Sequence, residues 1–316
     1  MMASPWNYYR GAAAVMADDL ASRPHSGLLV QLCGDAYVLS FGLWATPEQN
    51  LMFDLSDFDE TLPGPFEWDV QRLAARLVVA AREDGLKAAT ADEAVVTAVE
   101  AYRDCTARYA KMSELSFWYD GTHVDSLISY FTPADQGRIS VHIEKESRSR
   151  THLGVFAKLT SMVDSRPRID EDRPSRVAID DEQDALTDQF LTGYRMPLQE
   201  DRRFLFDRFT PVDVVRQVVG VASVGMRVYL VLLKRRSGSD PLFLQVKQAA
   251  PSVYEPYLGR SQHDKTERAR PRATRARHRR GYGRECTLLV GDHLELRAAV
   301  VPADSPKLQQ GAAPCP

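Results

Sequence analysis

Cysteine is scarce in this sequence, with only four among 316 residues. Cys33, Cys105, Cys286 and Cys315 show none of the paired spacings found in zinc sites and redox motifs. This scarcity excludes the common zinc-finger and dithiol classes, and it fits a protein kept in a reducing compartment.

Long hydrophobic runs are also lacking. The longest apolar stretch, residues 218–233, contains two glycines and Arg227 and is too short to cross a bilayer. Near the N-terminus, the apolar run at residues 12–17 ends at two aspartates, so it does not resemble a signal peptide. We therefore expect no membrane partner and a cytoplasmic location.

The composition that remains is that of a folded protein, with 44% hydrophobic and 26% charged residues. Apolar periodicity predicts an α+β chain with one large core or two modest ones. Helices are expected over residues 10–20, 68–83, 91–112, 182–198 and 202–209. Strands are expected over residues 28–33, 51–53, 212–221, 226–233 and 242–246, with a rigid turn at 63–65.

These elements divide the chain into four parts. A mainly helical lobe is predicted over residues 1–163, with helical periodicity that weakens in the charged stretch 138–150. Residues 164–181 are rich in Pro and Asp and are interpreted as a linker. Helices and a β-rich unit follow over 182–259, and a basic tail over 260–316.

Two acidic clusters, residues 34–42 and 53–60, each follow an apolar, strand-like run. In kinase-like enzymes one loop carboxylate accepts the substrate proton, and a second, after the next strand, holds magnesium. Asp35 is the candidate base. Asp57 and Asp59 are the candidate Mg²⁺ ligands, because in an extended chain their Cα atoms lie about 6.6 Å apart on one face. Turn and helix-cap roles are the alternative for such aspartates, and spacing alone leaves both open.

A second group of candidate residues lies in the β-rich unit. Gly220, Ser223 and Gly225 belong to a short turn between two predicted strands, where backbone amides could approach a nucleotide phosphate. Lys247 follows one strand later, as the phosphate-binding lysine of a kinase does. An ordinary hairpin with an edge-strand lysine is the alternative. Glu255 is a guess for the ion-pair partner of Lys247.

Four motifs give the sequence a resemblance to the bacterial family catalogued as domain of unknown function 2252, from about Ser4 to about Lys265. The motifs are residues 4–13 (SPWNYYRGAA), 34–36 (GDA), 57–69 (DFDETLPGPFEWD) and 219–225 (VGVASVG). The resemblance implies a kinase-like domain of two lobes that uses ATP and Mg²⁺ on an unknown phosphate acceptor. It implies a circularly permuted arrangement, because the acidic motifs precede the glycine turn and the lysine.

In that arrangement Asp35 corresponds to the catalytic-loop aspartate and Asp57 to the metal-binding one. Asp69 corresponds to the carboxylate that braces the loop in aminoglycoside-phosphotransferase-like enzymes, although a charge at a helix N-terminus is an equally good interpretation. Ser40 occupies the position of a metal-binding Asn, and Tyr37 that of a His. A Ser hydroxyl is a weaker ligand than an amide carbonyl, so metal affinity is expected to fall. Ala222 also departs from the family pattern, which has a Gly there.

The composition changes abruptly near the end of the resemblance. Residues 260–284 hold ten Lys or Arg and two acidic residues, a net charge of +8. Such a segment is a nucleic-acid-binding arm, a solvated tail or the out-of-frame reading of a GC-rich gene. We interpret it as out of frame, so that the kinase-like domain would be incomplete. If it binds nucleic acid, the binding should be weak and unspecific.

The sequence thus predicts an ATP- and Mg²⁺-dependent phosphotransferase site, weakened by the exchanges at Tyr37 and Ser40. The alternative is a truncated, non-catalytic remnant or binding module with a basic tail.

Overall fold

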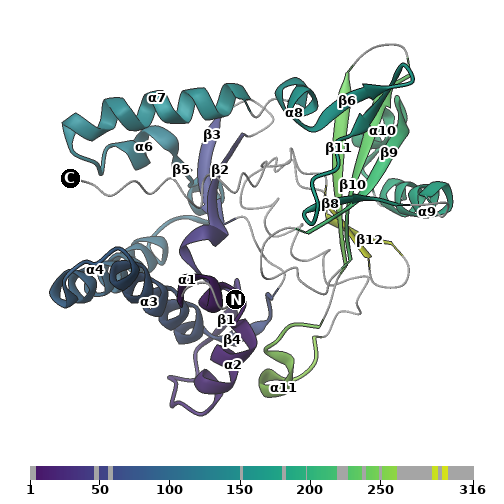
Figure 1. Ribbon diagram of the computed structural model, residues 1–316. Coiled ribbons are helices and arrows are strands. Elements are labelled where there is room, and N and C mark those ends of the chain that lie inside the picture. Colours follow the sequence, from purple (N-terminus) through teal and green to yellow (C-terminus); the bar gives the residue numbers. More distant parts are fainter. Residues whose placement is uncertain are drawn as a thin grey trace.

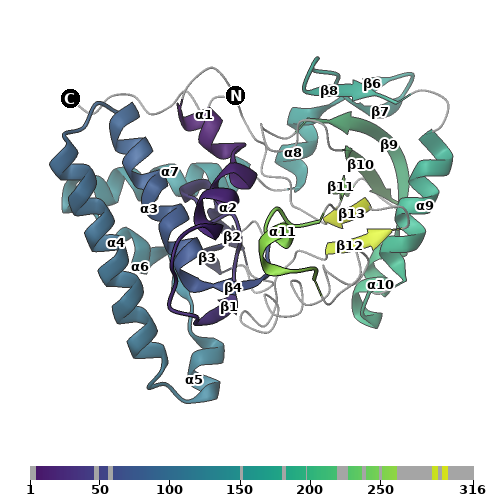
Figure 2. The same cartoon turned by 90° about the horizontal axis from the view of Figure 1, so that it is seen from below.

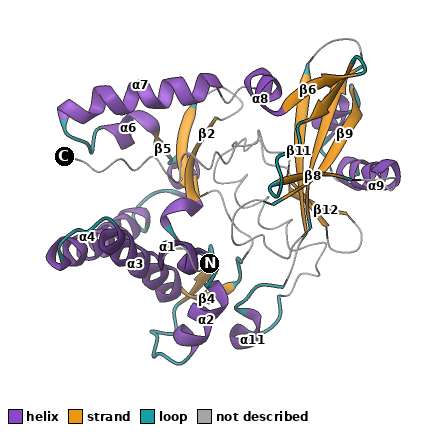
Figure 3. Ribbon diagram, in the orientation of Figure 1, coloured by secondary structure: helices purple, strands orange, loops and turns teal. Residues whose placement is uncertain are grey.

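A computed structural model shows a mixed α+β chain, whose described residues form four antiparallel sheets (Figures 1 and 3). It describes residues 5–45, 50–55, 60–149, 152–179, 183–196, 198–218, 227–236, 240–248, 251–261, 287–290 and 294–297. The α+β class predicted from the sequence is therefore confirmed.

The N-terminal part is built on two long helices, α3 (Phe66–Glu83) and α4 (Ala88–Tyr109), which pack against each other. Two short helices, α1 (Pro5–Arg10) and α2 (Ala13–Ala21), precede them. A two-stranded sheet pairs β1 (Leu29–Gln31) with β4 (Pro63–Pro65) directly before α3. This pairing positions the loop after β1 beside the first turn of α3.

A second sheet follows that loop. A 3₁₀ turn, η1 (Val38–Ser40), leads into β2 (Phe41–Ala45), which forms a hairpin with β3 (Leu51–Leu55). The third strand is β5 (Thr122–His123), and three helices flank it in sequence: α5 (Glu114–Tyr119), α6 (Val124–Ile128) and α7 (Pro133–Ser149).

The largest sheet has six antiparallel strands in the order β12-β13-β11-β10-β9-β8. Their bounds are β8 (Arg176–Ala178), β9 (Phe209–Gln217), β10 (Val228–Arg235), β11 (Pro241–Gln248), β12 (Thr287–Val290) and β13 (Leu294–Arg297). The strands β9, β10 and β11 agree with the sequence prediction. Figure 2 shows this sheet facing the helical part, with α11 (Glu255–Leu258) between the two.

Strand β10 forms the centre of this sheet because it is apolar on both faces. Val231 and Leu233 face a core with α9 (Gln183–Arg195) and α10 (Glu200–Phe206). Leu230 and Leu232 face a second core on the opposite side, since side chains alternate along a strand. That second core is completed by α8 (His152–Leu159) and by the hairpin of β6 (Thr160–Val163) and β7 (Arg166–Ile169).

A third core joins distant parts of the chain. Leu20 of α2, Leu32, Leu62 and Trp68 of α3 pack around Tyr254, which directly precedes α11. Tyr254 is fully buried, and its ring lies 5.4 Å from the Trp68 ring, measured between centroids. Packing against Trp68 and Leu20 therefore fixes the chain that leaves β11 on the helical part.

Several local predictions need correction. The expected turn at residues 63–65 is strand β4, and the strand expected to be buried at 28–33 is the exposed β1, whose partner in its sheet is β4. The charged stretch 138–150 continues as α7 up to Ser149, since its Lys, Glu and Arg residues are good helix formers.

Two predicted segments contain more structure than the sequence indicated. Strands β7 and β8 lie within the expected linker 164–181, and β12 and β13 lie within the expected tail 260–316. Their backbone groups are paired in sheets, which composition alone does not reveal. The domain boundaries themselves stay a prediction. None of the helices in the described ranges is both long and apolar enough to span a membrane.

Candidate functional site

The loop of residues 33–40 turns sharply at Gly34. Its φ is +94°, a left-handed conformation that side chains rarely tolerate. A Cβ atom at this position would overlap the backbone carbonyl of Glu60 and lie 2.7 Å from the Glu60 Cβ. Glycine is therefore required here, because the loop and the chain at Glu60 touch through their backbones.

The carboxylate of Asp69 holds the loop from the first turn of α3. Its Oδ2 accepts a hydrogen bond from the backbone N–H of Cys33 at 2.7 Å, and its Oδ1 accepts one from Gly34 at 3.1 Å. Burial raises the pKa of Asp69, while these two amide hydrogen bonds act in the opposite direction. The prediction that Asp69 braces the loop is confirmed.

The carboxylate of Asp35 forms an ion pair with Arg72, which lies one turn after Asp69 on the same face of α3. The Asp35 Oδ1 lies 2.8 Å from the Arg72 Nε and 2.6 Å from its Nη2. Arg72 is completely buried, whereas 18% of the Asp35 side chain is exposed. Burial lowers the pKa of Arg72, but the charge of Asp35 reverses this, so that the net pKa is raised.

Tyr9 of α1 packs against the side chain of Arg72. The Arg72 guanidinium carbon lies 4.1 Å from the centroid of the Tyr9 ring, and Nη2 donates to the Tyr9 carbonyl at 3.0 Å. The Tyr9 hydroxyl donates in turn to the Arg72 carbonyl at 2.6 Å. Tyr9 of α1 therefore fixes the orientation of the Arg72 side chain that pairs with Asp35.

Tyr37 packs toward the next arginine on α3. The guanidinium carbon of Arg76 lies 5.8 Å from the centroid of the buried Tyr37 ring and 5.5 Å from that of Tyr9. Burial lowers the pKa of Arg76 to about 10. One face of α3 thus contacts the loop through Asp69, Arg72 and Arg76.

Ser40 closes the loop. Its hydroxyl donates a hydrogen bond to the carbonyl of Asp35 at 2.8 Å, and the residue is buried. The hydroxyl therefore ties the end of the loop to its candidate base. Its predicted role as a metal ligand stays a prediction.

The hairpin of β2 and β3 returns the chain to the loop. Leu55, the last residue of β3, pairs with Phe41, which directly follows Ser40. Five residues later Glu60 packs against Gly34. The segment that holds Asp57 and Asp59 lies outside the described residues. Of the residues that flank it, Leu55 pairs with the residue that follows the loop of Asp35, and Glu60 lies against Gly34 in that loop.

The chain after β11 also contacts this loop. The Tyr254 hydroxyl donates a hydrogen bond to the carbonyl of Gly34. The Ser252 hydroxyl donates to the Glu60 carbonyl at 2.8 Å, and the Val253 N–H donates to the Glu60 Oε2 at 2.7 Å. We call residues 252–254 the latch, because they join the chain leaving the large sheet to the Asp35 loop.

Lys247 lies on β11, directly opposite Val228 near the start of β10. The glycine turn with Gly220, Ser223 and Gly225 lies outside the described residues. Gln217, the last residue of β9, and Val228, the first of β10, lie at the same end of the sheet as Lys247. Glu255, the suggested ion-pair partner, begins α11, and that pairing stays a prediction.

Comparison with known sequences assigns the chain to a family. Residues 1–276 match the family described as uncharacterized proteins conserved in bacteria, DUF2252. The chain belongs to the DUF2252 family. The match continues past Lys265, so the resemblance extends further than the sequence motifs indicated. No curated protein and no solved structure matches this DUF2252 chain.

The described residues of the first three motifs, at 4–13, 34–36 and 57–69, meet at one place in the fold. The motif at residues 34–36 belongs to the loop that holds Asp35. The motif at 57–69 begins in the acidic segment and ends at Asp69, which binds the backbone of that loop. The latch and Arg72 were missed by sequence reasoning. The clearest signal for Arg72 was its spacing of three residues from Asp69, which places both side chains on one helix face.

Proposed function

We propose that this DUF2252 protein is a kinase-like phosphotransferase that uses ATP and Mg²⁺, with Asp35 as its catalytic base. One observation carries the proposal: the β2–β3 hairpin and Glu60 bring both ends of the acidic segment back to the loop of Asp35. A loop carboxylate followed by a hairpin and a second acidic segment is the order in which kinase-like enzymes hold their base and their metal.

The contacts around Asp35 suit a catalytic base. Asp69 fixes the backbone before it, the Ser40 hydroxyl fixes its carbonyl, and Arg72 fixes its carboxylate. The carboxylate nevertheless stays partly exposed, so a substrate hydroxyl could reach it. A base held this firmly loses little entropy when the acceptor binds, which favours proton transfer in the correct geometry.

The acidic segment supplies the donor atoms that Mg²⁺ prefers. Asp57 and Asp59 offer carboxylate oxygens, and Ser40 adds a hydroxyl oxygen at the end of the loop. Bound Mg²⁺ would neutralise charge on the phosphates of ATP. We assign Asp57 and Asp59 as the main ligands, because the Ser40 hydroxyl already binds the Asp35 carbonyl.

The nucleotide phosphates would lie between the glycine turn and Lys247. The latch limits how far Lys247 can be from the acidic segment, because Ser252 contacts Glu60 and follows Lys247 by five residues. The Cα atoms of Lys247 and Ser252 are therefore at most roughly 18 Å apart, even in a fully extended chain. In this arrangement the nucleotide-binding strands follow the catalytic loop in sequence, which is a permuted order of the two kinase lobes.

Calorimetric titration with ATP, with and without Mg²⁺, tests the proposal. We expect Mg²⁺-dependent binding that weakens at least about tenfold in Asp57→Ala and in Lys247→Met, because each change removes a charged contact. Asp92→Ala, an exposed aspartate on α4, is the matched control and should bind as the unchanged chain does. Unchanged Mg-ATP affinity in folded Asp57→Ala, or no binding to the folded chain, would refute the proposal.

The ion pair of Asp35 favours a second candidate function, a nucleotide-binding module without catalysis. Two nitrogens of Arg72 already bind the Asp35 Oδ1, and a carboxylate held in such an ion pair serves a structural role as well as a catalytic one. Phosphate release from radiolabelled Mg-ATP separates the two functions. If the chain binds Mg-ATP and releases phosphate, and Asp35→Asn lowers the rate of release, the protein is an enzyme. Binding without release above the Asp35→Asn background indicates the module.

The basic segment 260–284 adds a proposal about partners. Its charge of +8 would bind nucleic acid through phosphates, weakly and without sequence preference. Binding of a labelled 20-mer single strand should disappear between about 50 and 200 mM salt. Equal affinity at both salt concentrations would contradict this electrostatic interpretation.

A further inference from the structure

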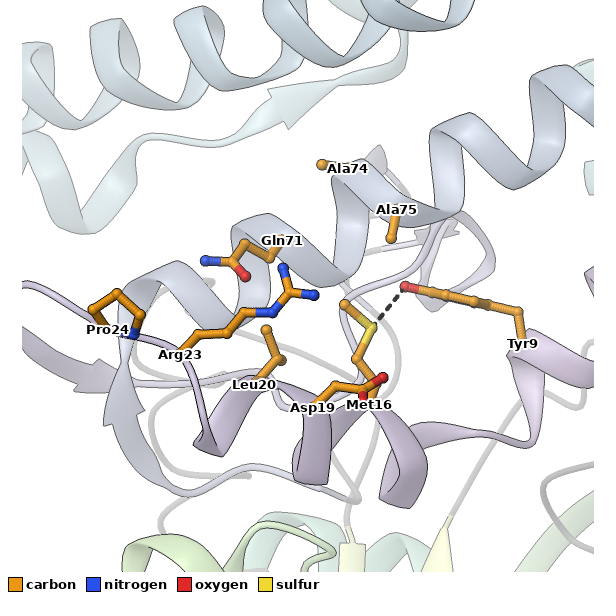
Figure 4. A pocket seen from close by; sticks show the side chains of 9 residues that line it. All are labelled: Tyr9, Met16, Asp19, Leu20, Arg23, Pro24, Gln71, Ala74 and Ala75. Carbon is orange, nitrogen blue, oxygen red and sulfur yellow. Dashed lines mark hydrogen bonds between the residues drawn. The ribbon is translucent and has the colours of Figure 1, made fainter.

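A pocket of about 610 Å³ opens between α2 and α3 (Figure 4). Its lining residues are Tyr9, Met16, Asp19, Leu20, Arg23, Pro24, Gln71, Ala74 and Ala75. Its volume falls within the range of small-molecule sites. None of these residues belongs to the motifs that led to the proposed phosphotransferase site, apart from Tyr9.

The pocket combines an apolar floor with small side chains on one wall. Leu20 is buried at its base, beside Met16, and Ala74 and Ala75 of α3 leave space above them. A ligand with a compact hydrocarbon part would cover Met16, Ala74 and Ala75, which are half-buried, and remove their apolar surface from water.

Three polar groups surround this floor. The Gln71 Oε1 is buried and has no hydrogen-bond partner among the described residues. Asp19 and Arg23 lie at the exposed rim, one helical turn apart, and no ion pair joins either side chain to another described residue. Figure 4 shows the Arg23 side chain extended over Leu20, with the Gln71 amide beside it and the Asp19 carboxylate on the other side.

We propose that this pocket binds a small zwitterion with an apolar side chain, that is, an apolar α-amino acid. Arg23 would bind the carboxylate through its two-pronged guanidinium. Asp19 is the acceptor for the ammonium group, and the apolar side chain lies on Met16 and against Ala74 and Ala75. An uncharged apolar ligand would make neither charged contact, with Arg23 or with Asp19, and this disfavours it relative to a zwitterion.

The pocket is connected to the Asp35 loop through Arg72. Met16 and Tyr9 line the pocket, and both contact Arg72: its Nη1 lies 3.5 Å from the Met16 Sδ, and its guanidinium packs on the Tyr9 ring. Arg72 in turn holds Asp35. A ligand in the pocket would therefore touch the side chains that orient the arginine of the ion pair.

Saturation-transfer NMR on the purified full chain tests the site, with L-leucine and L-methionine as probes and no nucleotide present. We expect both to bind. Isocaproate, which lacks the ammonium group, and isoamylamine, which lacks the carboxylate, should each bind at least about tenfold more weakly than leucine. Because the experiment contains no ATP, its outcome is independent of the phosphotransferase proposal.

Two variants locate the binding. Arg23→Gln should weaken leucine binding about tenfold, and Ala75→Leu should abolish it by filling the pocket. Arg82→Gln, which makes the same change at an exposed arginine of α3, should leave it unchanged. The proposal fails if the folded chain binds neither amino acid, if binding survives both pocket variants, or if isocaproate and isoamylamine match leucine. Circular dichroism establishes that each variant is folded.

Discussion

The hydroxyl of Tyr254 donates a hydrogen bond to the carbonyl of Gly34, a residue 220 positions earlier in the chain. This bond joins the chain that leaves the large sheet to the loop that holds Asp35. Both groups are buried, and burial raises the pKa of the Tyr254 hydroxyl, which therefore stays protonated and can donate. Lys247, the candidate lysine, precedes Tyr254 by seven residues, and Asp35, the candidate base, directly follows Gly34, so this bond limits the distance between them.

Removing this hydroxyl should destabilise the protein. Tyr254→Phe keeps the ring on Trp68 but leaves the buried Gly34 carbonyl without its partner, a loss of about 1–3 kcal/mol in the free energy of unfolding. Urea denaturation followed by tryptophan fluorescence measures it. Tyr257→Phe is the control, because that hydroxyl bonds Asp18 at the surface. If both variants lose the same free energy of unfolding, the buried hydrogen bond stabilises the protein no more than the surface one does.

Substitution of Gly34 should be far more damaging than its dihedral angle alone implies. Gly34→Ala introduces both a left-handed alanine and an overlap with the Glu60 backbone, so we expect a loss of about 3 kcal/mol or more. Gly85→Ala is the matched control, because Gly85 also has a positive φ, +70°, but open space around it. It should lose only about 1 kcal/mol. If Gly34→Ala and Gly85→Ala lower the free energy of unfolding equally, the prediction that Gly34 closely approaches the Glu60 backbone is wrong.

Sequence reasoning recovered the parts of this site that depend on local pattern. The apolar runs of β10 and β11 predict strands without ambiguity. Asp69, in the first turn of α3, was linked to the Asp35 loop through the family motif that ends at it. The fully buried Arg72 was missed because amphipathic patterns assign charged residues to the exposed face. The latch was missed because a contact across 220 residues has no local signal.

The pH dependence of stability should show two aspartates that act in opposite directions. Burial raises the folded-state pKa of Asp69 above its unfolded value of 3.8, so the folded state holds the proton more tightly there. The stability of the unchanged chain relative to Asp69→Asn should therefore fall as the pH rises from 3.8 to the raised pKa. Urea denaturation between pH 3 and 7 measures this difference.

Asp207 provides the opposite sign. The hydrogen bond from Arg195 lowers the pKa of Asp207, so its contribution is present above pH 3.8 and is lost as the pH falls. The stability of the unchanged chain relative to Asp207→Asn should therefore fall toward low pH. A rise with pH in the Asp69→Asn comparison would mean that the amide bonds to Asp69 outweigh its burial.

The ion pair between Asp35 and Arg72 should show strong energetic coupling. Arg72→Met alone leaves Asp35 without its cation and removes the stacking on Tyr9, so we expect a loss of about 3 kcal/mol. Asp35→Asn alone leaves a buried guanidinium without its counter-charge. The double variant leaves neither charge without a partner, so it should lose less than the sum of the two single variants. A double-mutant cycle on the free energy of unfolding should therefore give a coupling above about 1 kcal/mol.

The surface pair of Arg103 and Asp104 is the control for that cycle. Both side chains are about two-thirds exposed, at 67%, and the two groups lie 2.8 Å apart, so the geometry of contact resembles that of the buried pair. Water and salt screen exposed charges, and the same cycle there should give no measurable coupling. If the two cycles agree, Arg72 holds Asp35 no more firmly than a surface contact does, and α3 would not fix the candidate base.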